Sequence, residues 1–112
     1  MSQVVMTRGP RDGQKLSKTV TDASKIEQLL ASAEAIQAPT SIMKVKWTHD
    51  VDVMTVQLSK PVGVFTDGVV EVWGEGRRLR VPGQTSYSFY PSSESDQTAK
   101  LASDVGELWN SA

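Results

Sequence analysis

The sequence predicts a single α+β domain, residues 1–112, in which two amphipathic helices pack on one face of an antiparallel β-meander of about five to seven strands. Three observations lead to this fold class. Apolar residues recur at three- and four-residue steps near residues 22–37 and 93–109, they alternate at two-residue steps through the middle of the chain, and short turn sequences separate the alternating stretches. A chain of 112 residues has the size of one domain.

The first helix is expected to begin at Asp22, whose carboxylate can accept hydrogen bonds from the free amides of the first turn. Its apolar stripe includes Ile26, Leu29 and Ala33, and Pro39 ends it. Before it, turn sequences in residues 7–14 separate two short apolar segments, which predicts a hairpin with a long loop.

The middle of the chain is predicted to be β-structure. Residues 42–48 and 53–58 alternate cleanly, which is typical of antiparallel strands with one buried and one wet face. The Asp67-Gly68 pair between residues 62–65 and 69–73 predicts a second hairpin, and residues 78–81 and 87–90 continue the pattern.

The second helix is expected to start with a cap formed by Ser93 and Asp96. Its apolar stripe ends at Trp109, which should seal the helix against the sheet. Gly106 interrupts the stripe, so the last turn is expected to be weak.

Composition excludes several classes of function. The formal net charge is −1, so no global field attracts nucleic acid or an anionic membrane. There is no cysteine, hence no disulfide, thiolate metal ligand or cysteine nucleophile. The sequence has neither a secretory leader nor an apolar stretch of membrane-spanning length, and we therefore expect a cytoplasmic protein.

His49 is the only histidine, and with Asp50 and Asp52 it could form an N/O metal site or a base oriented by a carboxylate. A polar hairpin turn explains the same residues, and no second imidazole or thiolate is present to complete a metal site. Gly74 and Gly76 lack the third glycine and the following helix of a dinucleotide loop. We therefore predict no catalytic, cofactor-binding or metal-binding residues and no enzymatic activity.

The remaining candidates for a site are cations beside a tryptophan. Trp73 has the alternation of the wet face, so it is either an exposed interface residue or is turned inward by a bulge at Gly74. The predicted partner-binding residues are Trp73, Arg77, Arg78, Arg80, Lys44 and Lys46. Tyr90 could join them on the same sheet surface.

These residues favour a non-catalytic protein-interaction module of the inhibitor, immunity, adaptor or small-subunit type, which binds through an exposed sheet face. The partner is expected to be another protein, or a second copy of the chain in a homodimer. One alternative is a protein that binds nucleic acid or a small anionic ligand on the basic face, although the RNP-type pattern of an RNA-binding sheet is absent. The other alternative is a small enzyme that uses His49 and Asp50.

Overall fold

A computed structural model describes residues 2–39, 41–74, 78–83, 87–91 and 96–112. In chain order its elements are β1 (Val4–Pro10), β2 (Leu16–Val20), α1 (Ala23–Glu34), β3 (Met43–Lys44), β4 (Asp52–Gln57), β5 (Val69–Trp73), β6 (Arg78–Leu79), β7 (Ser88–Phe89) and α2 (Asp96–Ser111). The predicted α+β class with an antiparallel sheet and two helices is confirmed.

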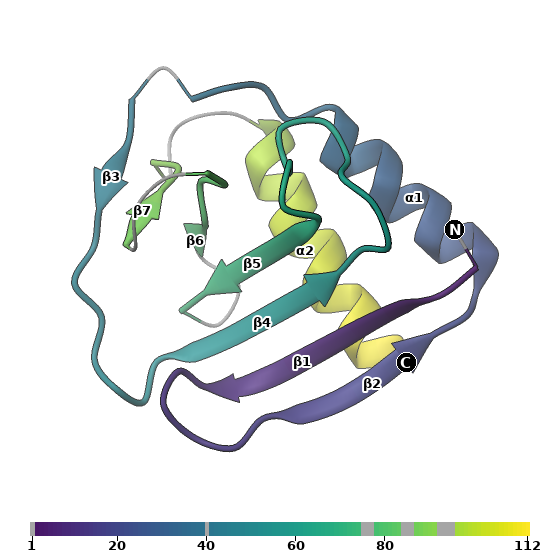
Figure 1. The fold of residues 1–112 in the computed structure, drawn as a ribbon, viewed down its shortest axis with the longest axis horizontal. Coiled ribbons are helices and arrows are strands. Elements are labelled where there is room, and N and C mark those ends of the chain that lie inside the picture. The colour runs from purple at the N-terminus through teal and green to yellow at the C-terminus, as the bar shows by residue number, and fades with distance from the viewer. Residues whose placement is uncertain (1, 40, 75–77, 84–86, 92–95) are drawn as a thin grey trace.

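Five strands form the main sheet in the order β2-β1-β4-β5-β6, with every neighbouring pair antiparallel (Figure 1). The order is not sequential throughout, because the chain leaves β2 through α1 and β3 before β4 pairs on the free side of β1. Strand β7 pairs with β3 in a small second sheet, and a bridge between Arg80 and Phe89 ties this sheet to the chain after β6. Strand β3 thereby lies at the outer edge of the molecule.

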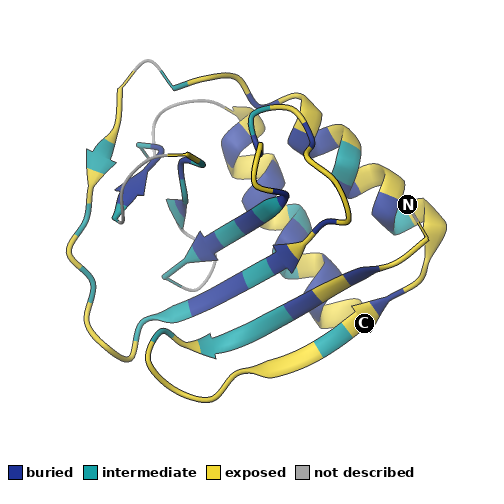
Figure 2. Ribbon diagram, viewed as in Figure 1, coloured by how far each residue is buried: buried dark blue, intermediate teal, exposed yellow. Residues whose placement is uncertain are grey.

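Both helices lie on the same face of the main sheet and contact each other there (Figure 1). The core between them and the sheet is built from alternating strand residues, such as Met6 of β1, Val56 of β4 and Val72 of β5, each fully buried. From the helices it receives Leu29 and Leu101. Figure 2 shows this alternation as dark bands along the central strands.

The helices begin and end close to the predicted positions. Asp22 caps α1 and accepts a hydrogen bond from the amide of Lys25, as expected. Helix α2 continues through Gly106 to Ser111, and the predicted Trp109 seal is confirmed because this side chain is buried in the core. The proposed cap at Ser93 lies outside the described residues.

Three details of the predicted β-structure are wrong. Of residues 42–48 only Met43–Lys44 form a strand, and it pairs with β7, whereas β4 lies between β1 and β5. Residues 62–65 do not form a strand, because Val62 and Phe65 bond to each other across a tight turn and their side chains fill the core. Strand β5 pairs instead with β4. Tyr90 does not join the wet surface, since it is buried in the core and its hydroxyl donates to the carbonyl of Gln37.

Among the described residues, neither helix is long and apolar enough to cross a membrane.

Candidate functional site

A second group of apolar side chains covers part of the sheet face that points away from the helices. We call Trp47, Trp73, Tyr87 and Phe89 the aromatic cluster. The Trp73 ring centroid lies 5.4 Å from that of Phe89, 6.2 Å from that of Trp47 and 6.5 Å from that of Tyr87. The Trp47 and Phe89 rings meet edge to face at 5.7 Å, a separation at which aromatic pairs attract. Segments far apart in the sequence are thereby held together by ring contacts.

Backbone geometry allows this close packing at Gly74. Its φ is +69°, and a Cβ atom there would lie 2.8 Å from Cη2 of Trp47. Only glycine fits both the left-handed backbone and the close approach of the indole ring. The residue that follows β5 therefore fixes where Trp47 sits.

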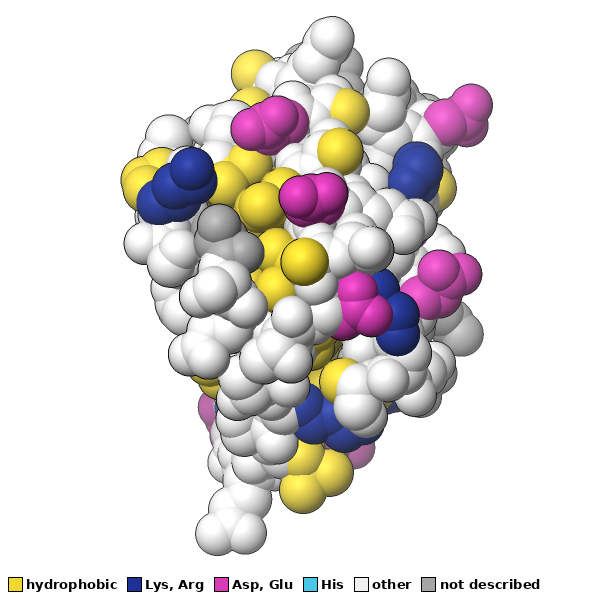
Figure 3. Space-filling model, turned by 90° about the vertical axis from the view of Figure 1, so that its right-hand side faces the viewer, with side chains coloured by type: hydrophobic (Ala, Val, Ile, Leu, Met, Phe, Trp, Pro, Cys, Tyr) yellow, Lys and Arg dark blue, Asp and Glu magenta, His cyan; other side chains and the backbone are white. Residues whose placement is uncertain are grey.

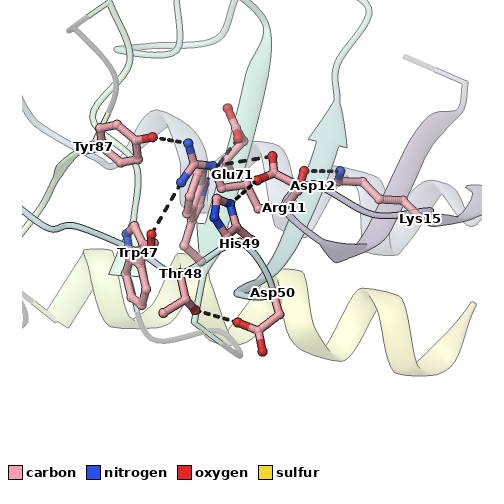
Figure 4. A network of polar contacts seen from close by, with 10 residues as sticks. Arg11, Asp12, Lys15, Trp47, Thr48, His49, Asp50, Glu71 and Tyr87 are labelled. Atoms are coloured by element: carbon pink, nitrogen blue, oxygen red, sulfur yellow. Dashed lines mark hydrogen bonds and ion pairs between the residues drawn. The ribbon is translucent and has the colours of Figure 1, made fainter.

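Arg11, from the loop between β1 and β2, lies over the aromatic cluster (Figure 4). Its guanidinium carbon is 4.7 Å from the ring centroid of Tyr87 and 5.9 Å from that of Trp73, within range of a cation–π attraction. The guanidinium also donates to the Tyr87 hydroxyl and, at 3.5 Å, to the backbone carbonyl of Trp47. Arg11 thus links the first hairpin to the β3 and β7 segments.

Beside this cluster is an open groove with a volume of about 660 Å³. We call it the basic groove; its lining residues are Arg11, Lys44, Val45, Lys46, Trp47, His49 and Tyr87. Lys44 and Lys46 are exposed, whereas Val45 and Trp47 between and after them are half-buried. No carboxylate of the described residues lies within ion-pair distance of either lysine.

His49 stands at the rim of the groove, and its side chain is 92% exposed. Its Nδ1 lies 2.9 Å from a carboxylate oxygen of Asp12, and this hydrogen bond holds the pKa of Asp12 below its ordinary value. Asp50 is engaged elsewhere: the Thr48 hydroxyl donates to it at 2.6 Å and lowers its pKa (Figure 4). The carboxylate that contacts His49 is therefore Asp12 and not Asp50.

The N/O ligand set considered as an alternative for His49, Asp50 and Asp52 is not assembled. Asp52 pairs with Arg8 at 2.9 Å, and His49 contacts Asp12. Within the ranges that the structure describes, no group of three His, Cys, Asp or Glu side chains comes close enough to hold a metal ion.

Comparison with protein-family models, curated proteins and solved structures found no match. The site must therefore be interpreted from its own chemistry.

The structure separates the predicted partner-binding residues into two groups. Lys44 and Lys46 line the basic groove, and Trp73 lies beneath Arg11 in the aromatic cluster. Arg80 is held by carboxylates, with Nη2 2.8 Å from Asp67 and Nε 2.6 Å from Glu71, and its side chain is 18% exposed. Arg78 is half-buried, and Arg77 lies outside the described residues. The partner-binding role of all six stays a prediction.

Trp73 is neither turned inward by a bulge nor fully exposed, since it pairs in register with Val53 and Arg78 and is half-buried. It is on the face opposite Val70 and Val72, as its position in the alternation predicted, and its indole nitrogen donates to Glu71 at 3.2 Å. It is nevertheless half-buried, because the other rings of the aromatic cluster pack against it.

Sequence reasoning missed Arg11 and Tyr87. Arg11 belongs to a stretch of the sequence that indicated only a turn. Its contact with Trp47 depends on the position of the β1–β2 loop relative to the segment before β4. Tyr87 has a φ of +71°, a backbone strain that no sequence pattern announces and that tends to occur at functional positions.

Proposed function

We propose that this protein is a non-catalytic interaction module that binds another protein at the basic groove. The observation that carries the proposal is the gathering of cations around an apolar floor. Arg11, Lys44 and Lys46 come from two separate segments of the chain, and half-buried Val45 and Trp47 lie between and beside them. Aromatic and arginine side chains in a well-packed setting are the usual content of protein-binding hot spots.

Lys44 and Lys46 make no ion pair with the described residues, whereas Arg11 also lies 3.9 Å from a carboxylate oxygen of Asp12. Figure 3 views the molecule from the side away from β3, and acidic and basic side chains are interspersed there. Lys100 pairs with Asp104 at 2.9 Å, and Arg8 pairs with Asp52. The two lysines of the groove therefore offer charge complementarity to an acidic partner.

An enzymatic role has weaker support. A base of the Ser–His type needs a nucleophile within hydrogen-bond reach, on the ring nitrogen that the carboxylate leaves free. Among the described residues, no hydroxyl is hydrogen-bonded to His49, and the Thr48 hydroxyl is bonded to Asp50. Because His49 is so exposed, water would also surround any proton transfer that it carried out.

Site-specific photo-crosslinking tests the proposal. A photoreactive amino acid replaces Lys46 in the groove, or as a matched control Lys60, which is also exposed but does not line the groove. Each variant is irradiated in an untreated and in a nuclease-treated lysate of the source cells, with and without an excess of unlabelled wild-type protein.

We expect position 46 to capture a defined protein that the excess wild-type protein displaces, and position 60 to capture none. The proposal is wrong if both positions capture the same material, if position 46 captures nothing, or if capture requires intact nucleic acid. Cross-linking only to a second copy would make the groove a homodimer contact.

A further inference from the structure

The edge of β3 has unpaired backbone groups beside the groove. Strand β3 pairs with β7 alone among the described strands. The amide of Val45 donates to the carbonyl of Tyr87 at 3.1 Å, so Val45 faces β7. In an antiparallel ladder, successive residues direct their amide and carbonyl groups to opposite sides. The backbone groups of Lys44 therefore face away from β7, toward the open edge. If the alternation continues past β3 through Val45, those of Lys46 face the same way.

The side chains along this edge have two distinct faces. Lys44 and Lys46 are exposed on one face, whereas Met43, Val45 and Trp47 are half-buried on the other. In a β-ladder, residues directly opposite each other place their side chains on the same face. A strand that adds to β3 would therefore set one alternate series of side chains beside the lysines and the other beside the apolar residues.

Resting on the proposed function, we infer that the partner supplies an extended segment in which acidic and apolar residues alternate, and that this segment adds to β3 as a further strand. Its acidic side chains pair with Lys44 and Lys46, and its apolar side chains extend the apolar floor at Val45 and Trp47. Its backbone satisfies the outward amides and carbonyls, as in other complexes formed by strand addition.

A single-stranded nucleic acid fits the same groove less well. It would need free aromatic faces on which bases stack. Here the guanidinium of Arg11 lies over Tyr87, and Trp47 and Trp73 are in contact with each other and with Phe89. The cations remain available, but the rings are already occupied. An extended peptide needs only the edge and the lysines.

Fluorescence anisotropy with defined peptides tests the inference. The probe is a labelled peptide of about eight residues, long enough for an average strand, in which glutamate and valine alternate. We expect it to bind wild-type protein, and we expect Lys46→Glu to weaken binding at least about tenfold while the matched Lys60→Glu changes it less than about twofold. The same peptide with lysine in place of glutamate should not bind.

Two further probes separate strand addition from simple charge attraction. N-methylation of one alternate set of peptide amides should abolish binding, and N-methylation of the other set should leave it intact, because only one set faces β3. Amide exchange measured by NMR should slow at Lys44 and Lys46 on binding but not at Val45, whose amide is already bonded.

The inference is overturned if both methylated peptides bind equally, if the Glu/Val probe does not bind, or if an oligothymidine of equal charge binds more tightly. It is also overturned if light scattering shows a dimer that Lys46→Glu dissociates. Should photo-crosslinking at position 46 still capture a protein in any of the first three cases, the proposed function survives and only strand addition fails.

Discussion

At the scale of single residues, the close contact between Gly74 and Trp47 constrains the packing of the aromatic cluster. A Cβ on Gly74 would approach the indole to 2.8 Å, and Trp47 in turn contacts Trp73 and Phe89. Because the rings touch one another, a displacement of Trp47 must also displace its neighbours. Because Gly74 has no Cβ, the indole ring of Trp47 can take the position in which it lines the basic groove.

We predict that Gly74→Ala destabilises the protein more than Gly83→Ala does. Both residues have positive φ, +69° and +75°, so each alanine incurs the left-handed backbone cost of about 1–2 kcal/mol. Among the described residues, Gly74 has a close neighbour in Trp47, whereas none lies within 4 Å of a Cβ at Gly83. Overpacking should add about 1–3 kcal/mol at Gly74.

Urea unfolding measures both free energies, and near-ultraviolet circular dichroism reports the environment of the tryptophans. We expect the aromatic spectrum of Gly74→Ala to change and that of Gly83→Ala to remain like wild type. Equal losses of stability in the two variants would show that the contact with Trp47 does not matter.

At this scale, the role of a residue could be predicted from the sequence where it depends only on residues nearby in the chain. Asp22 was predicted as the cap of α1 because a cap depends only on the first helical turn. Arg11 could not be predicted, because its partners Trp47 and Tyr87 are 36 and 76 residues away in the chain. A single sequence carries no signal for such pairs.

At the scale of elements, a polar contact joins the two helices. The hydroxyl of Ser32 on α1 donates to the carboxylate of Asp104 on α2, and Nζ of Lys100 lies 3.1 Å from the hydroxyl and 2.9 Å from the carboxylate. Ser32 is buried and the Asp104 side chain is 11% exposed. This triad adds a directional polar contact between α1 and α2 to their apolar packing.

We predict that Ser32 and Asp104 are energetically coupled. Ser32→Ala should cost about 1 kcal/mol, and Asp104→Ala about 1–3 kcal/mol because it leaves the buried hydroxyl without its acceptor and leaves Lys100 with only the Ser32 hydroxyl to donate to. The double variant should cost less than the sum, by about 0.5–1.5 kcal/mol. Chemical denaturation of the four proteins gives the cycle.

Ser24→Ala is the matched control, since Ser24 lies on the exposed side of α1. It should be additive with Asp104→Ala to within about 0.5 kcal/mol. Strict additivity of Ser32→Ala and Asp104→Ala would instead mean that the triad contributes nothing to helix pairing.

Element types were predictable where the apolar period was long enough to be unambiguous. The helical stripes placed α1 and α2 within a few residues of their observed ends. The strand prediction for residues 62–65 failed because three apolar side chains and a glycine beside a turn suit a strand and a core-filling loop equally well. Whether these residues form a strand or a loop depends on how they pack in the core, which the local sequence does not determine.

At the scale of the whole molecule, the sheet carries two separate apolar clusters. The core beneath the helices contains residues of β1, β2, β4, β5 and β6, whereas the aromatic cluster on the opposite face draws on β5, β7 and the segment after β3. The sequence indicated strands with one buried and one wet face. It did not indicate that a second layer covers one end of the face opposite the helices. Covering requires β7 and β3 to fold back over Trp73, and strand order is not encoded in the alternation of any one strand.

We predict that the two regions open independently. Native-state hydrogen exchange should be slowest for amides of β1 and β4, which lie in the middle of the main sheet, and should report the free energy of global unfolding there. Amides of β3 and β7 should exchange through a smaller local opening. Gly74→Ala should accelerate exchange in β7 and β3 beyond its effect on β1.

The opposite outcome is a single cooperative unit. If amides of β7 exchanged with the same free energy and denaturant dependence as those of β1, the aromatic cluster would be part of the main core in energetic terms. The Gly74→Ala variant would then accelerate exchange evenly across the protein.

The position of β1 between β2 and β4 has a consequence for the growing polypeptide on the ribosome. The hairpin of β1 and β2 can close early, but the other side of β1 waits for β4, about 40 residues later in translation, which corresponds to about 2–8 seconds of elongation. During that interval a bare strand edge with apolar Val4 and Met6 is open to neighbouring nascent chains. Helix α1 emerges in the same interval, and by settling on this hairpin it would shield those side chains until β4 arrives.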